Sequence, residues 1–192
     1  GRLDFLGHDD GPSPVQSALE SLVKTLKREF APDYIFIDSR AGLHDLGGLS
    51  LTSLAHVDVI VTRADRQGLQ GLRLVLDGIR RRRQAAERRI CIVHNFARLP
   101  IGKEHANAAE EAQFRTAVYQ AFSIAQLYTD PPDVDDATTA HYPVVIGAYD
   151  EILRSERLSV MSDAVLENEP FRSLRRRIEE LATREVTGDE SA

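Results

Sequence analysis

Several polar residues directly follow short apolar segments, where α/β proteins often carry binding chemistry. Asp38 ends the apolar segment 33–38 (DYIFID), and Gly42 follows four residues later. A carboxylate at the end of a buried strand is costly unless a cation such as Mg²⁺ compensates its charge. A glycine at this distance lets the backbone approach a phosphate and donate its N–H. The D-x-x-x-G spacing predicts a phosphate-sensing switch, and a turn capped by Asp38 and bent at Gly42 is the alternative.

A second group of polar residues follows two later apolar segments. Asn95 ends the segment 89–95 (RICIVHN), and its amide group can both donate to and accept from a purine edge. A turn closed by Asn95 before Phe96 is the alternative interpretation. A proline- and aspartate-rich loop follows the segment 123–129 (SIAQLYT), and it could form one wall of a base pocket or be an ordinary connection. The candidate residues here are Thr129, Asp130 and Pro131.

Other residues with reactive or charged side chains have structural explanations. Asp65 is positioned to cap the helix that contains Gly68. His94 and Cys91 lie in an apolar segment and are expected to be a core histidine and a buried, unreactive thiol. The aspartates that follow Thr129 lack the spacing and central glycine of an EF-hand loop, which argues against a calcium site.

The arginine-rich stretch 80–89 is the strongest basic feature of an acidic chain. It contains six arginines and one glutamate, which gives a charge of 6 − 1 = +5. Most such runs form the solvated face of a helix, and contact with a nucleic-acid phosphate backbone is the alternative. No aromatic residues interleave with these arginines, so base stacking is not predicted for this stretch.

Alternating helices and strands must position these residues. Apolar residues recur at a helical period from Pro14 to Phe30, which predicts a helix that Pro32 ends. Short β-branched segments predict buried strands, and longer periodic segments predict helices. The predicted strands are 33–38, 57–62, 89–95 and 123–129, and the predicted helices are 49–56, 68–87, 104–122, 144–157 and 170–184. This order predicts an α/β fold with a mostly parallel sheet flanked by helices.

Length and composition restrict the possible classes of protein. The 192 residues carry 24 basic and 30 acidic side chains, so the net charge is 24 − 30 = −6. We expect one α/β domain over 14–184, a loop at 1–13 and a disordered tail at 185–192. No run of 18 apolar residues and no signal-peptide pattern occur, which predicts a cytoplasmic protein without a membrane span. The acidity argues against nucleic acid as the main partner.

Together, these segments resemble the ParA/MinD-like branch of the P-loop NTPases, the deviant Walker ATPases. DYIFIDSRAG resembles the strand and D-[ST]-x-x-G switch of that family, and VDVIVTRADRQGLQGLRLVL is similar to its next strand and helix. CIVHNFAR resembles the family strand that ends in an adenine-contacting asparagine. The family spacing V-x-x-A-x5-P-V is reproduced by Val134, Ala137, Pro143 and Val144. The resemblance covers residues 33 to about 150.

The resemblance implies a nucleotide switch that uses ATP and Mg²⁺ on an incomplete three-layer P-loop NTPase fold. Asp38 would hold the magnesium ion and Gly42 would sense the γ-phosphate, so these two would be the catalytic residues. Asn95 would contact adenine. The base loop would comprise Thr129, Asp130 and Pro131, with the family's proline shifted or replaced at Thr129. A nucleotide-controlled homodimer, or a complex with a partner protein, is also implied.

The phosphate loop of the family has no counterpart in this sequence. That loop contains G-K-[ST], whose lysine reaches the β- and γ-phosphates, and no such motif occurs here. We therefore expect the C-terminal two-thirds of a nucleotide-switch ATPase, inactive without its phosphate-loop part. The alternative is a non-enzymatic interaction domain on a degenerate NTPase fold, with the stretches 80–89 and 170–184 as contact faces. A nucleic-acid-binding regulator is the third and least supported class.

Overall fold

The computed structural model describes residues 14–38, 55–82, 89–97, 104–149, 165 and 168–183. The chain divides into two compact units, residues 1–55 and 56–192. Helix α1 belongs to the first unit, and the sheet with its helices belongs to the second. The loop expected at 1–13, the tail expected at 185–192 and Gly42 lie outside the described residues.

In the first unit, helix α1 spans Pro14–Phe30, as its apolar period predicts. Pro14 takes the first helical position, where a missing N–H costs no intrahelical hydrogen bond. The helix ends at Ala31, which has a φ of 42° and donates its N–H to the Lys27 carbonyl oxygen at 3.1 Å. Pro32 follows and cannot continue the helix.

The prediction of a buried strand at 33–38 is wrong. The segment forms neither helix nor strand, and Tyr34 and Phe36 are 52% and 84% exposed. Their rings stack on each other, with centroids 6.2 Å apart. An apolar, β-branched segment becomes a strand only where a neighbouring strand supplies backbone hydrogen bonds and packing. The sheet formed by the described residues does not include this segment.

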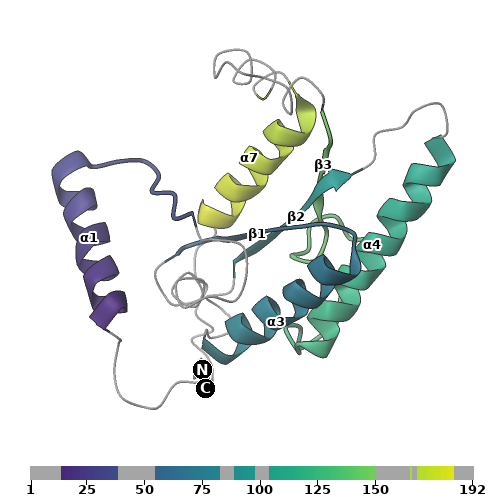
Figure 1. Ribbon diagram of the computed structural model, residues 1–192, viewed down its shortest axis with the longest axis horizontal. Coiled ribbons are helices and arrows are strands. Elements are labelled where there is room, and N and C mark those ends of the chain that lie inside the picture. The colour runs from purple at the N-terminus through teal and green to yellow at the C-terminus, as the bar shows by residue number, and fades with distance from the viewer. Residues whose placement is uncertain are drawn as a thin grey trace. The chain divides into compact units, whose positions relative to one another are not determined.

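The second unit contains a parallel three-stranded sheet in the order β1-β2-β3 (Figure 1). The strands span Asp58–Thr62 (β1), Ile90–Ala97 (β2) and Val144–Gly147 (β3). Thr62 of β1 lies opposite His94 of β2, and Val93 of β2 lies opposite Val144 of β3. Because the strands run in the same direction, their carboxyl ends point toward one edge of the sheet.

Helices cover both faces of this sheet (Figure 1). Helices α3 (Arg66–Arg82) and α4 (Glu104–Ile124) contact each other, and Phe114 of α4 stacks on His94 at 4.1 Å between ring centroids. Helix α7 (Glu169–Thr183) packs against β2 and β3. It covers the other face of the sheet, since successive residues of β2 point alternately to the two faces. The buried cluster that includes α7 comprises Cys91, Val93, Ile146 and Leu181. The predicted α/β class with a parallel sheet flanked by helices is confirmed.

Most predicted elements of the second unit are confirmed with shifted ends. The predicted strands 57–62 and 89–95 correspond to β1 and β2, and the predicted helices 68–87, 104–122 and 170–184 correspond to α3, α4 and α7. Residues 83–87 and 184, at the predicted ends of two of these helices, lie outside the described residues. The helix predicted at 49–56 is not helical at residues 55 and 56, and its remainder lies outside the described residues. None of the helices that the structure describes combines the length and apolar character needed to cross a membrane.

The strand predicted at 123–129 is wrong, because α4 continues to Ile124 and the chain then reverses direction. Gln126 has a φ of 51°, and its N–H donates to the Ser123 carbonyl oxygen at 3.0 Å. The Leu127 N–H donates to the Phe122 carbonyl oxygen at 3.1 Å. These bonds satisfy the last carbonyl groups of α4, so the segment closes the helix instead of joining the sheet.

The helix predicted at 144–157 is wrong over its first part. Residues 144–147 form β3 and pair with β2, and residues 150–157 lie outside the described residues. Val144, Val145 and Ile146 are β-branched, and such side chains fit a pleated sheet well. Four residues are too few for periodicity to separate helix from strand, so only the pairing with β2 decides the conformation.

A close approach between β1 and α3 explains why residue 68 is a glycine. Asp65 caps α3 as predicted, since its Oδ1 accepts a hydrogen bond from the Gly68 N–H at 2.7 Å. A Cβ at Gly68 would lie 2.5 Å from the Arg63 carbonyl oxygen and 2.8 Å from Thr62 Oγ1. The absence of a side chain therefore allows the first turn of α3 to follow β1 directly.

Replacing Gly68 by alanine should destabilise the protein by about 1–3 kcal/mol, because the new methyl group overlaps backbone atoms. Urea unfolding followed by circular dichroism measures this change. Gly71 is the matched control, because a Cβ there meets nothing within 4 Å. Its replacement by alanine should stabilise α3 by about 0.5–1 kcal/mol. If both substitutions shifted stability in the same direction, the close approach at Gly68 would be contradicted.

Candidate functional site

The carboxyl ends of β1 and β2 bring polar groups together at one edge of the sheet. Ligands of open parallel sheets bind in the crevice outside these ends. Because Thr62 lies opposite His94, the residues that follow them leave the sheet at the same edge. We use the name carboxyl-edge site for Arg63, Asp65, Asn95 and Phe96.

Asn95 and Phe96 form an irregular end of β2. The register between β2 and β3 shifts between Asn95 and Ala97, so Phe96 is the extra residue of a β-bulge. Phe96 has a φ of 57°, and its N–H donates to Asn95 Oδ1 at 3.0 Å. This bond agrees with the interpretation of Asn95 as a residue that organises the local backbone. Its NH₂ group, in contrast, has no hydrogen-bond partner among the described residues.

The Arg63 guanidinium lies over the exposed ring of Phe96. Its Cζ atom is 5.6 Å from the ring centroid, within the range of a cation–π interaction. Arg63 Nε is also 3.7 Å from Asp65 Oδ2, so the carboxylate that caps α3 also orients the guanidinium. The carboxyl-edge site therefore presents a flat apolar ring, a positive charge and an amide donor, which together suit a planar ligand that carries hydrogen-bond acceptors and negative charge.

The predicted base loop lies in a different connection. Thr129, Asp130 and Pro131 are exposed, and they belong to the segment 125–143 between the end of α4 and the start of β3. They do not follow a strand, because the strand predicted before them is absent. No hydrogen bond or ring contact between described residues joins this segment to Asn95 or Phe96. The base-binding role of the three residues stays a prediction.

The segment 125–143 is organised around His141, whose side chain is completely buried. His141 Nε2 is 3.2 Å from the Val134 carbonyl oxygen, to which it donates, so Nδ1 is the acceptor for the Tyr128 hydroxyl at 2.8 Å. The Tyr128 oxygen also accepts the His141 backbone N–H at 3.1 Å. Burial lowers the pKa of His141 and raises the pKa of Tyr128 to about 12. Both side chains are therefore neutral near pH 7.

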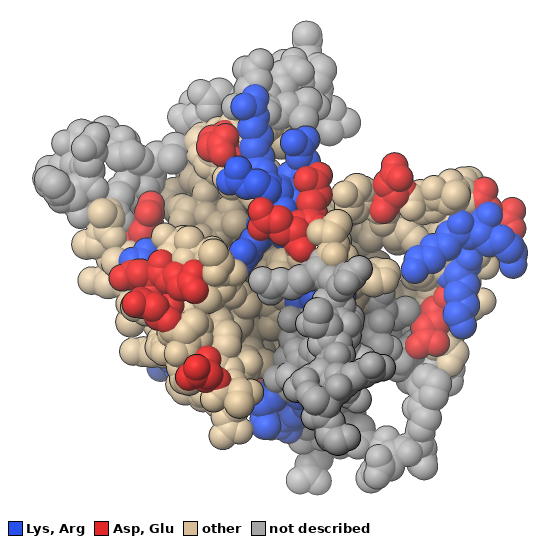
Figure 2. Space-filling view, turned by 180° about the vertical axis from the view of Figure 1, so that it is seen from behind, with Lys and Arg blue, Asp and Glu red and all other residues tan. Residues whose placement is uncertain are grey.

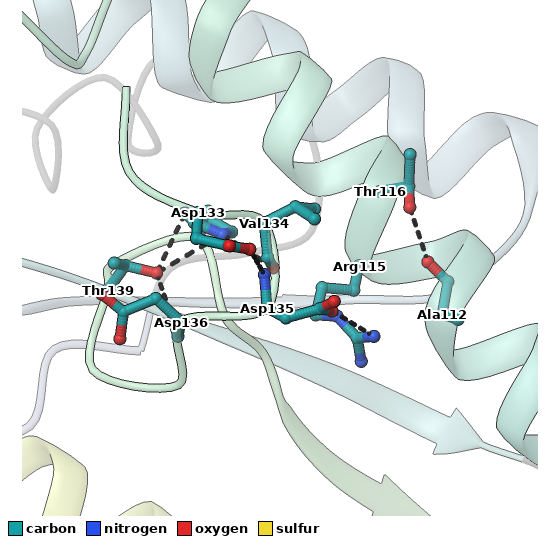
Figure 3. A network of polar contacts seen from close by, with 9 residues as sticks. Ala112, Arg115, Thr116, Asp133, Val134, Asp135, Asp136 and Thr139 are labelled. Atoms are coloured by element: carbon teal, nitrogen blue, oxygen red, sulfur yellow. Dashed lines mark hydrogen bonds and ion pairs between the residues drawn. The ribbon is translucent and has the colours of Figure 1, made fainter. Parts of the chain in front are cut away.

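The acidic side chains of this segment take part in its own polar contacts (Figure 3). Asp135 Oδ1 lies 2.6 Å from Arg115 Nη2 of α4. Asp133 Oδ1 accepts the Asp135 N–H at 2.8 Å, and Asp136 Oδ1 accepts the Thr138 N–H at 2.9 Å. Hydrogen bonds from Thr138 lower the pKa of Asp136. In the part of the chain that the structure describes, no three His, Cys, Asp or Glu side chains gather around a possible metal position.

The arginine stretch 80–89 is partly paired within the second unit. Arg81 Nη2 lies 2.7 Å from Asp77 Oδ2, and Arg80 Nη2 lies 3.5 Å from Asp77 Oδ1. Arg89 Nη1 donates to the Ala182 carbonyl oxygen at 3.1 Å, near the end of α7, where a cation is favourable. Figure 2 shows acidic side chains beside basic ones on the face that it presents. The contacts of Arg80 and Arg81 agree with an exposed helix face at the end of α3, and residues 83–88 lie outside the described residues.

The remaining candidate residues are Asp38, Gly42, His94 and Cys91. Asp38 is exposed in the first unit, and Gly42 lies outside the described residues, so their metal-binding and switch roles stay predictions. His94 and Cys91 are confirmed as buried, at 2% and 1% exposure. Burial raises the pKa of the Cys91 thiol to about 11, which leaves it protonated and unreactive at neutral pH.

Sequence reasoning missed Phe96 and Arg63 as site residues. The available signal was an aromatic residue directly after a polar strand end, together with an arginine directly after the preceding strand. Neither feature predicts the β-bulge that exposes the ring.

Comparisons with models of protein families, with curated proteins and with solved structures find no match for this chain. The ParA/MinD-like resemblance therefore rests on the motifs and their order in the sequence.

Proposed function

We propose that this chain supplies the base-binding part of a nucleotide-controlled ATPase of the ParA/MinD-like kind. The observation that carries the proposal is the position of Asn95 at the carboxyl end of β2, the central strand of the described sheet. The next residue, Phe96, has an exposed ring, and Arg63 from the end of the neighbouring strand contacts that ring. This edge is where open parallel sheets bind ligands.

The chemistry of the site fits an adenine nucleotide. The Asn95 NH₂ group can donate to a ring nitrogen of the base, and Arg63 and the exposed Arg66 add positive charge at the same edge. The role of Asp38 as a Mg²⁺ ligand is proposed from the D-x-x-x-G spacing alone, since Asp38 belongs to the first unit. The 192 residues contain no G-K-[ST] motif. We therefore expect them to hydrolyse ATP very slowly unless a phosphate loop is supplied.

Substitution of Asn95 by aspartate tests the proposal. Aspartate keeps an oxygen that can accept the Phe96 N–H, but it removes the NH₂ donor and adds a negative charge. Calorimetric titration with Mg²⁺ and ATP should show binding to the wild-type chain and an affinity at least tenfold lower in Asn95→Asp, which corresponds to about 1.4 kcal/mol. Unfolding in urea should be nearly unchanged.

Gln113→Glu is the matched control, because it makes the same amide-to-carboxylate change at an exposed position of α4. Its affinity for ATP should equal that of the wild-type chain. Equal losses in the two variants would assign the effect to net charge alone, and a wild-type chain that binds no ATP would refute the proposed function.

A non-enzymatic interaction domain is the second candidate. Val59 and Val61 of β1 are 39% and 60% exposed, although they pair with the buried Cys91 and Val93 of β2. These two side chains lie on one face of β1 and would add apolar surface to a contact with another protein. This candidate becomes the better one if the titration gives no nucleotide binding.

A further inference from the structure

The backbone of Phe96 adopts a conformation that its residue type disfavours. A φ of 57° is rare for any residue with a bulky side chain, because Cβ crowds the backbone. The Asn95 side chain supports this conformation by accepting the Phe96 N–H at 3.0 Å. The next residue, Ala97, is buried again at 3% exposure, so the irregularity is confined to one position. Bulges of this kind re-aim a side chain, frequently beside a functional site.

Core packing does not explain the orientation of this ring. Phe96 is 45% exposed, whereas His94, two residues earlier in β2, is 2% exposed. An aromatic ring that remains half in water gains only part of the free energy available from full burial. Strained backbone at such a position is a reason to look for a function.

We propose that the Phe96 ring and the Arg63 guanidinium form a stacking platform for the heteroaromatic base of a nucleotide. This inference rests on the proposed function, and it assigns the base to a surface that the sequence motifs do not include. The ring supplies an apolar face, and the Arg63 guanidinium, which lies over the ring and pairs with Asp65, supplies a planar cation. The Asn95 NH₂ group, attached one residue before the ring, can then donate to an acceptor on the base edge. Any base can stack on an aromatic side chain, so the Asn95 amide would determine which base is preferred.

The test compares two replacements of Phe96 that differ in aromaticity. Phe96→Leu keeps an apolar side chain but has no π face, and Phe96→Tyr keeps the aromatic ring. Phe96→Leu should weaken binding of both ATP and adenosine roughly tenfold, and Phe96→Tyr should remain within about twofold of wild type. A purely structural role for Phe96 predicts equal affinities for the two variants. Thermal unfolding checks that both remain folded.

Arg63→Gln provides a second, independent variant. It should also weaken binding of adenosine, whereas Arg73→Gln should have no effect, because Arg73 is an exposed arginine in the middle of α3. Adenosine carries no phosphate, so a loss at Arg63 cannot be attributed to attraction of a phosphate group.

The two ligands separate failure of this inference from failure of the proposed function. If ATP binds and Phe96→Leu binds it as tightly as wild type, the stacking platform is wrong and the proposed function stands. If adenosine binds through Phe96 but ATP binds no more tightly, the platform stands and the triphosphate-dependent function fails. If neither ligand binds the wild-type chain, both are overturned.

Discussion

Replacement of His141 by alanine should lower the free energy of unfolding by about 3–5 kcal/mol, which is the largest effect that we expect from a single substitution. The side chain is completely buried and packs against three aromatic rings. Ring centroids of Tyr119, Tyr128 and Phe122 lie 5.0, 5.7 and 6.3 Å from that of His141. Truncation removes this packing and leaves a cavity.

The same substitution also leaves polar groups without partners. The Tyr128 hydroxyl loses its acceptor, and the Val134 carbonyl oxygen loses its donor. The loss of these two part-buried hydrogen bonds is included in the expected 3–5 kcal/mol. Because these two residues belong to the segment 125–143, we expect that segment to lose its fixed conformation first.

Urea unfolding at pH 7.5 measures this effect, with His56→Ala as the matched control. His56 is exposed in the same unit, so its loss should change stability by less than about 0.5 kcal/mol. A His141→Ala chain as stable as His56→Ala would show that the segment does not depend on the buried ring.

Acidification below pH 6.5 should destabilise the protein steeply. His94 and His141 both have pKa values below the ordinary value of 6.5, chiefly because burial disfavours their charged forms. Nearby carboxylates oppose this shift: Glu110 acts on His94, and Asp136 and Asp133 act on His141. Arg115 reinforces the shift at His141.

The direction of the effect follows from which state binds protons. Well above pH 6.5 both histidines are neutral in the folded and unfolded chains, so stability does not depend on their protonation. Below pH 6.5 the unfolded chain takes up protons that the folded chain still excludes, and stability falls as the pH falls toward the lowered pKa values. Each histidine contributes a slope of at most about 1.4 kcal/mol per pH unit.

Urea unfolding between pH 5 and pH 8 measures the slope, and His94→Phe separates the two contributions. His94 Nδ1 is buried and has no hydrogen-bond partner among the described residues. A phenylalanine removes that orphaned atom and keeps a ring to stack on Phe114, so stability at pH 8 should be unchanged or higher. The acid slope should be roughly halved in this variant. If the slope did not change, protonation of His94 would not contribute to the loss of stability in acid.

The long periodic segments of the chain were predictable, because their apolar residues recur at one period over many positions. Helices α1, α3, α4 and α7 were found in this way, and the apolar runs of β1 and β2 were long enough to identify. The three wrong predictions, at 33–38, 123–129 and 144–157, rest on short apolar stretches, whose pattern alone does not determine the conformation. Pairing with β2 made a strand of 144–147, and closure of α4 made a turn of 125–126.

The candidate site was predictable to the extent that it depends on strand ends. Asn95 and Asp65 were found because they lie at or shortly after the end of an apolar segment. The exposure of Phe96 depends on a register shift between β2 and β3, and β3 itself was not predicted. His141 was missed because a histidine in a proline- and aspartate-rich segment normally indicates exposure, and only its tertiary contacts bury it.

The most direct test of the central claim, a nucleotide site at the carboxyl edge of the sheet, is an NMR titration of the ¹⁵N-labelled chain with Mg²⁺ and ATP. We predict the largest shifts at the Asn95 side-chain NH₂ and at the backbone amides of Arg63 and Phe96. Amides at the opposite edge, such as those of Asp58 and Ile90, should move little. Shifts confined to that opposite edge, or no shifts at saturating ATP, would contradict the claim.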